Sequence, residues 1–140
     1  MGATRLLERD DLLSELREHA RASRTGDGRI VLVGGEAGAG KTSLVERFRR
    51  DLTVTTEVMW GSCEPMTAPA PFGPLLDFAT ELVEDFEDLI GWRARRYRLF
   101  TGVLASLKAT GRHRLLVFED LHWADEATFD LLRFLSRRIV

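Results

Sequence analysis

The chain has 140 residues, 44% of them hydrophobic and 30% charged, which is typical of one globular domain and excludes disordered, collagen-like and disulfide-scaffold classes. Its 20 Lys and Arg against 22 Asp and Glu give a formal charge of -2, which excludes a global basic field for nucleic acid or acidic membranes. Cys63 is the single cysteine, and neither a signal peptide nor a long apolar span is present in the sequence. We therefore expect a cytoplasmic protein with no membrane partner.

The first third of the chain predicts a helix, a strand, a glycine-rich loop and a second helix. Apolar residues recur at helical spacing over residues 6–22 and again over residues 42–52. Between them, residues 29–33 form a short, mostly β-branched run that is typical of a strand buried on both faces, ending at Gly34. The order is therefore strand, glycine loop, helix.

The rest of the chain predicts two further strands and three helices. We expect strands at residues 55–60 and 114–118, and helices at residues 75–90, at residues 100–107 and after Asp125, which can cap the last one. All four prolines lie within residues 65–74, which predicts an extended connector. Strands that alternate with helices indicate an α/β fold with a parallel sheet, here of about three strands.

The strongest chemical signal is the pattern G-x-x-x-x-G-K-[ST], the Walker A motif, at residues 35–42, between the predicted strand and helix. Its members are Gly35, Glu36, Ala37, Gly38, Ala39, Gly40, Lys41 and Thr42, with Ser43 directly behind them. Glycines let backbone N–H groups converge on a phosphate, Lys41 can reach the β- and γ-phosphates, and Thr42 can ligate Mg²⁺. The alternative is a glycine-rich turn with an exposed lysine.

A second signal lies at residues 115–120, where an apolar strand ends in Glu119 and Asp120. Ligands gather at this end of the strands in open α/β sheets. The segment is similar to a Walker B motif, in which the first acid holds Mg²⁺ and the second orients the attacking water. The commoner order has Asp first, so Glu119 brings an extra methylene to the metal position. The alternative is a strand-end turn with two solvated acids.

Residues 119–128 and 131–135 together resemble the Walker B region of AAA+/STAND-like ATPase domains, as found in large bacterial LuxR-type transcriptional regulators. Similar family features are the box Glu8-Arg9-Asp10, the stretch at residues 61–65 and the proline loop at residues 69–75. The resemblance covers nearly the whole chain. It implies a three-layer α/β/α P-loop NTPase fold, ATP and Mg²⁺ as cofactors, and a place near the adenine for Arg9, for which an ordinary surface position is the alternative.

The resemblance also implies how the chain is organised. The family inserts the strand that follows Walker B between the two Walker strands, and then adds a further strand and a helical lid. We therefore expect residues 1–140 to be the N-terminal portion of a single ATPase domain with an incomplete sheet. Other subunits or C-terminal domains are the expected partners besides nucleotide, without direct nucleic-acid binding by this segment.

Several smaller features have two interpretations. His122 and Trp123 either help to position the γ-phosphate or serve packing and hydrogen bonding. The arginines within residues 93–98 either contact nucleic acid or form a solvated helix face, the latter being favoured. Cys63 and His113 are expected in strand packing and strand entry.

Three function hypotheses follow. The first is a module of a bacterial signalling protein that binds ATP and, in complete form, hydrolyses it, with Lys41, Glu119 and Asp120 as catalytic residues. The second is a nucleotide-binding or interaction fragment without turnover. The third, a small-molecule P-loop kinase, lacks an arginine-rich lid after the second acidic motif. ATP is preferred because no guanine-reading motif is present.

Overall fold

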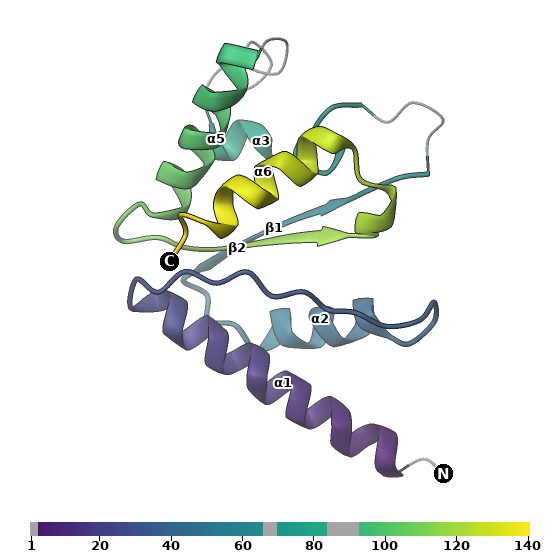
Figure 1. Ribbon diagram of the computed structural model, residues 1–140. Coiled ribbons are helices and arrows are strands. Elements are labelled where there is room, and N and C mark those ends of the chain that lie inside the picture. The colour runs from purple at the N-terminus through teal and green to yellow at the C-terminus, as the bar shows by residue number, and fades with distance from the viewer. Residues whose placement is uncertain (1–2, 66–69, 84–92) are drawn as a thin grey trace. The chain divides into compact units, whose positions relative to one another are not determined.

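The computed structural model describes residues 3–65, 70–83 and 93–140, and the chain forms two compact units (Figure 1). The first unit spans Met1–Val54 and contains the helices α1 (Ala3–Arg24) and α2 (Lys41–Asp51). The second unit spans Thr55–Ile139. Its elements are β1 (Thr56–Ser62), the 3₁₀ helix η1 (Gly73–Leu75), α3 (Ala79–Leu82), α5 (Arg93–Leu107), β2 (His113–Glu119), the 3₁₀ helix η2 (Leu121–Trp123) and α6 (Glu126–Ser136).

The first unit confirms the two helices predicted at residues 6–22 and 42–52. Helices α1 and α2 contact each other, and Leu13 of α1 and Leu44 and Phe48 of α2 are buried. Leu44 and Phe48 lie four residues apart, so they share one face of α2. Exposed ion pairs such as Arg17–Asp51 at 2.5 Å contribute at most about 1 kcal/mol, so burial of these side chains is the main stabilising contact between the helices.

The strand predicted at residues 29–33 is wrong. This segment has no regular secondary structure, and its apolar side chains are exposed, with Leu32 at 77%. A strand needs a neighbour that pairs with its backbone N–H and C=O groups, and the one sheet within the described ranges consists of β1 and β2 alone. The β-branched composition favours an extended backbone but supplies no pairing partner.

The second unit contains a parallel sheet, as predicted, but with two strands instead of about three. Strands β1 and β2 confirm the runs predicted at residues 55–60 and 114–118. Strand β1 begins one residue later and ends two residues later than predicted, and β2 is longer by one residue at each end. The register pairs Thr56 with His113 and Ser62 with Glu119, so the carboxyl ends of both strands lie at one edge. The unit is therefore α/β, in a form compatible with part of a P-loop NTPase fold.

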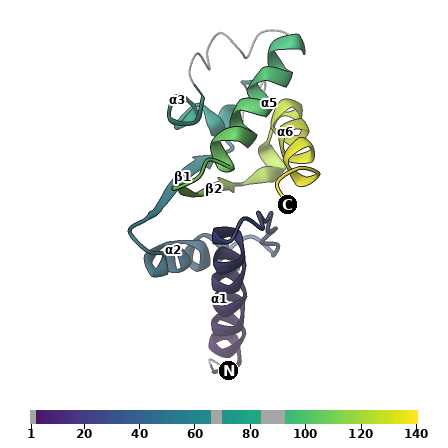
Figure 2. The same cartoon turned by 90° about the vertical axis from the view of Figure 1, so that its left-hand side faces the viewer.

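The helices of the second unit cover one face of this sheet, as the two perpendicular views show (Figures 1 and 2). Met59 of β1 belongs to the main core, and Leu116 and Phe118 of β2 pack against it. The same core takes buried side chains from η1, α3, α5 and α6, including Phe72, Leu75, Leu99, Val103 and Leu131. Because side chains alternate along a strand, Val58, Trp60, Leu115, Val117 and Glu119 lie on the opposite face.

The helix predicted at residues 75–90 differs from what the structure shows. Pro74 lies in the 3₁₀ helix η1, and α3 has four residues before Val83 turns to an extended conformation. The residues 84–92 and the proline-loop residues 66–69 lie outside the described part of the chain. Of the apolar positions that predicted this helix, Leu75, Ala79 and Leu82 lie in the core, whereas Leu76 is exposed.

The last two helices confirm the predictions with one change of boundary. Helix α5 begins at Arg93, seven residues before the predicted start. Helix α6 begins at Glu126 directly after Asp125, whose side chain accepts a hydrogen bond from the backbone N–H of Thr128. This is the N-cap geometry that the sequence predicts.

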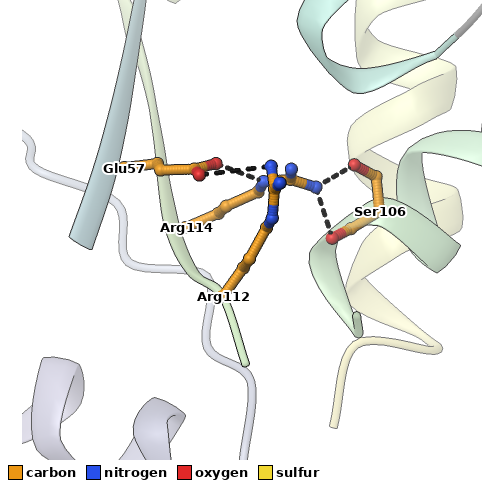
Figure 3. Close-up of polar contacts among 4 residues, drawn as sticks. All are labelled: Glu57, Ser106, Arg112 and Arg114. Carbon is orange, nitrogen blue, oxygen red and sulfur yellow. Dashed lines mark hydrogen bonds and ion pairs between the residues drawn. The ribbon is translucent and has the colours of Figure 1, made fainter. Parts of the chain in front are cut away.

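A buried arginine connects α5 to the amino end of the sheet (Figure 3). The side chain of Arg114 is 6% exposed, and its Nε donates to Glu57 at 2.8 Å. Its Nη1 donates to the carbonyl oxygen of Ser106 at 2.7 Å and also contacts the Ser106 hydroxyl. The hydrogen bond from Arg114 holds the pKa of Glu57 below its usual range, with burial acting in the opposite direction and Arg112 adding to the lowering.

Candidate nucleotide site

The glycine-rich loop of residues 35–40 has a backbone that glycine alone adopts easily. Gly35, Gly38 and Gly40 have φ values of 154°, 76° and 81°. Gly40 is the N-cap of α2, so the N–H groups of the first helical turn follow directly on the loop. A helix N-terminus with converging N–H groups and a partial positive charge is suited to binding a phosphate.

The ammonium group of Lys41 is held against the same loop. Its Nζ donates to the carbonyl oxygens of Gly35 at 2.9 Å and of Glu36 at 2.8 Å. Both contacts curl the side chain back over the loop that it follows. Residues 34–39 are exposed, so a ligand can approach this positive group from solvent.

Arg9 also contacts this loop, which the sequence did not predict. Its Nη2 donates to the carbonyl oxygen of Ala39 at 3.2 Å. A Cβ at Gly40 would overlap this guanidinium and lie 3.1 Å from its Cζ. The structure thus brings together Arg9, the glycines and Lys41, while the expected place of Arg9 near an adenine stays a prediction.

The loop fits a nucleotide phosphate by two observations. The glycine cradle has no side chains at the positions with left-handed backbone, and a lysine and an arginine lie against it. Thr42 in the first unit offers a hydroxyl oxygen, and Glu119 and Asp120 in the second unit offer carboxylate oxygens. These are the hard donors that Mg²⁺ prefers, and Mg²⁺ is usually bound by one or two carboxylates together with substrate phosphates.

The acidic pair lies where β2 ends. Glu119 is the last residue of the strand and Asp120 follows with φ 54° and ψ 43°, a left-handed conformation that Asp tolerates better than most residues. Asp120 is the N-cap of η2, and its side chain is exposed. Non-glycine residues in this conformation cluster at functional sites, which supports a role for this turn.

Strand β1 and Cys63, the residue that follows it, hold Glu119 by both its main chain and its side chain. The N–H of Cys63 donates to the carbonyl oxygen of Glu119 at 3.0 Å. The indole Nε1 of Trp60 donates to Oε2 of Glu119 at 2.9 Å. Sequence analysis missed Trp60, because its proximity to Glu119 depends on the register of the two strands. The alternation of side chains on predicted strands could have suggested it only after that register was known.

The structure also places the smaller features of the sequence, namely the His122–Trp123 pair, two arginines of α5 and His113. His122 and Trp123 are both exposed and their rings are 5.1 Å apart, so Trp123 is not a buried packing residue. Arg96 lies 6.0 Å from the ring of Phe72, a contact at cation–π distance, and Arg98 is exposed. His113 begins β2 and contacts Thr56 at 3.0 Å, as expected for strand entry.

Cys63 is buried behind the carboxyl end of β1, in agreement with a packing role. Burial raises the pKa of its thiol, and the negative charges of Asp125 and Asp120 raise it further. The thiol therefore stays protonated near neutral pH and is a poor nucleophile.

A cleft of about 210 Å³ is lined by Cys63, Glu64, Asp77 and Trp123, among other residues. Pockets for drug-sized ligands usually measure about 300–1,000 Å³. The cleft lined by the described residues is smaller than this range.

Asp125 does more than cap α6. Its Oδ1 accepts hydrogen bonds from the N–H groups of Thr128 at 3.0 Å and of Phe72 at 3.1 Å, and its Oδ2 accepts from the Thr128 hydroxyl at 2.5 Å. Phe72 has φ 59°, which is unfavourable for a bulky residue. Asp125 therefore fixes the proline-rich loop in a strained conformation, a role that sequence analysis missed because it links residues 53 positions apart.

The pH dependence of stability should reveal this carboxylate. Burial acts to raise the pKa of Asp125, but the hydrogen bonds from Thr128 and Phe72 outweigh it and lower the pKa below its usual value. A lowered pKa in the folded state stabilises the fold above the unfolded pKa of about 3.9, and this contribution disappears as pH falls through the folded value. We expect the stability difference between the wild type and Asp125→Asn to shrink below about pH 4 in urea unfolding. A difference that is constant from pH 7 to 3 would contradict this account.

The first unit contains a glycine-rich loop with Lys41, and the second contains a parallel strand that ends in two acids. Each of these features is typical of P-loop α/β nucleotide-binding modules. Comparison with protein families agrees, since the AAA ATPase domain family matches residues 5–139. The chain belongs to this family. Neither the curated proteins nor the solved structures contain a significant match to it. Among the described residues no helix is both long and apolar enough to cross a membrane.

Proposed function

We propose that this chain binds ATP with Mg²⁺ and, in a complete domain, hydrolyses it. The observation that carries the proposal is the loop of residues 35–40, whose left-handed glycines lead into α2 with Lys41 folded over it. Membership of the AAA ATPase domain family supports nucleotide binding as the activity class. The preference for ATP over GTP rests on the family and on the absence of a guanine-reading motif in the sequence.

Each candidate residue has a role in this proposal. The backbone of Gly35, Glu36, Ala37, Gly38, Ala39 and Gly40, with Ser43 and Arg9, binds the nucleotide, and Lys41 neutralises the β- and γ-phosphates. Thr42, Glu119 and Asp120 would hold Mg²⁺, which supplies charge neutralisation when bound. Asp120 also orients the attacking water. Lys41, Glu119 and Asp120 are thus the proposed catalytic residues.

We also propose the larger setting that the resemblance implies. Residues 1–140 would be the N-terminal portion of a single three-layer α/β/α ATPase domain, with Walker A at residues 35–42 and Walker B at residues 115–120. Residues 29–33 support this proposal. They form an apolar, β-branched run of the kind found in buried strands, yet they are exposed and their backbone pairs with no described strand. The proposed protein is a cytoplasmic bacterial regulator whose further domains or subunits respond to the nucleotide state.

The alternative is a nucleotide-binding or interaction fragment without turnover. It is favoured by the small size of the sheet, which has two strands in the described part of the chain. Phosphate release from Mg-ATP, measured on a protein that contains the complete domain, separates the two proposals. The ATPase predicts release that is lost in Glu119→Gln and in Asp120→Asn, whereas the alternative predicts Mg²⁺-dependent binding with no release in any of these proteins.

Binding itself is tested by titrating the purified chain with a fluorescent ATP analogue and Mg²⁺. Lys41→Ala should weaken binding by about 10- to 100-fold, because a charge-assisted hydrogen bond contributes about 1.5–3 kcal/mol. The chain has one other lysine, Lys108, which is exposed and outside the motifs, so Lys108→Ala is the matched control. If Lys41→Ala and Lys108→Ala bind equally well, the phosphate site lies elsewhere.

A further inference from the structure

The side chain of Glu119 is held by a residue of the neighbouring strand that no motif contains. The indole Nε1 of Trp60 donates to Glu119 Oε2 at 2.9 Å across the parallel pair. Trp60 is in register with Val117, so Glu119 lies two residues further along β2 on the same face of the sheet. The contact therefore runs diagonally, toward the carboxyl edge where the acidic pair lies.

The identity of both residues matters for this contact. A glutamate has one more rotatable bond than an aspartate, and its carboxylate lies further from the backbone. An indole N–H is a donor with a single direction and no acceptor capacity, so it fixes one carboxylate oxygen. Phenylalanine could fill much of the same half-buried space but could not donate this bond.

The main chain at Glu119 is fixed as well. Ser62 pairs with Glu119 in the register, and the N–H of Cys63 donates to the Glu119 carbonyl oxygen at 3.0 Å. With the backbone fixed, the remaining freedom of Glu119 lies in its side-chain torsions, which the Trp60 donor restricts. Carboxylates that bind metals are commonly oriented in this way, and removing the outer partner typically costs 10- to 100-fold in metal affinity or activity.

We propose that Trp60 is a positioning residue, which orients the Glu119 carboxylate for Mg²⁺ in the nucleotide-bound protein. The proposal rests on the proposed function, because it takes Glu119 as a Mg²⁺ ligand. It also accounts for a glutamate where an aspartate is commoner, since the longer side chain can be held by a donor on the adjacent strand.

The test measures the Mg²⁺ concentration that half-saturates binding of the fluorescent ATP analogue. Trp60→Phe should raise this concentration about tenfold, and Glu119→Gln should raise it at least as much. Thr56→Val is the matched control, because it removes the Thr56–His113 contact between the same strands and on the same face, at the opposite end of the register. This control should lower the melting temperature without moving the Mg²⁺ dependence.

A second, spectroscopic measurement tests the same contact without substituting Trp60. The chain has three tryptophans, so with Trp92→Phe and Trp123→Phe the emission comes from Trp60 alone. Adding Mg²⁺ to the nucleotide-bound protein should change this emission, and Glu119→Gln should abolish the change. If Trp60→Phe does not unfold cooperatively and is therefore not folded, the emission measurement is the test of the proposal.

The outcomes are distinct. A Trp60→Phe protein that keeps the wild-type Mg²⁺ dependence, while Glu119→Gln loses it, overturns the positioning role and leaves the proposed function intact. An emission that Mg²⁺ does not change overturns it as well. If Glu119→Gln also binds with unchanged Mg²⁺ dependence, the metal role given to Glu119 under the proposed function is itself wrong.

Discussion

Gly61→Ala is expected to destabilise the protein by about 3 kcal/mol, the upper end of what overpacking a core costs. Gly61 is buried in β1, on the face that carries the main core, and the backbone of η1 lies directly against it. An added Cβ would lie 2.7 Å from the carbonyl carbon of Pro74 and closer still to its oxygen. Because the obstacle is backbone, it cannot move aside like the end of a flexible side chain.

Urea unfolding followed by circular dichroism measures this change, and Gly73→Ala provides the control. Gly73 begins the same η1 segment, but an added Cβ there would meet nothing within 4 Å. The control should therefore stay within about 0.5 kcal/mol of the wild type. Equal stabilities of the two variants would show that η1 does not pack on β1 as described.

Asp125→Ala should have an effect of similar size, about 3 kcal/mol. The substitution removes the N-cap of α6, which contributes about 1 kcal/mol, and leaves the N–H of Phe72 without its acceptor in a buried place, which costs about 1–3 kcal/mol. The same substitution removes the hydrogen bond that holds Phe72 in its left-handed conformation.

Asp125→Asn separates these contributions, because an asparagine oxygen can still accept from backbone N–H groups. We expect it to lose less than half as much stability as Asp125→Ala in the same unfolding experiment. A loss in Asp125→Ala below about 0.5 kcal/mol, the level of an ordinary surface substitution, would refute the tethering role.

Local patterns predicted most of the elements correctly. Helical spacing located α1, α2 and α6, and apolar runs located β1 and β2, since each of these signals depends on neighbours within a few residues. Asp125 was predicted as a cap because capping is also local. The glycine pattern likewise predicted a loop that leads into a helix, and its left-handed glycines confirm the geometry of that loop.

The predictions that were wrong, and the contacts that were missed, all depend on residues that are distant in the sequence. Residues 29–33 have the composition of a strand, but strand formation needs a partner that composition does not reveal. The start of the long helix predicted at residues 75–90 is a 3₁₀ turn in the structure. Pro74 lies in this turn, and Phe72 and Leu75 anchor it in the core. The Trp60–Glu119 contact follows from the β1–β2 register, and the Phe72–Asp125 contact from the packing of two loops. None of these could be derived from spacing along one segment.

The most direct test of the central claim, that the chain binds Mg-ATP through its glycine-rich loop, is thermal unfolding with and without Mg-ATP, with Lys41→Ala beside the wild type. At a ligand concentration of about 100 times Kd the wild type should gain roughly 2.7 kcal/mol and melt several degrees higher. At the same ligand concentration, the 10- to 100-fold weaker binding expected for Lys41→Ala should reduce this gain to about 0.4–1.4 kcal/mol. A wild-type transition that does not move with Mg-ATP, or a gain in Lys41→Ala as large as that of the wild type, would contradict the assignment of this loop as the nucleotide site.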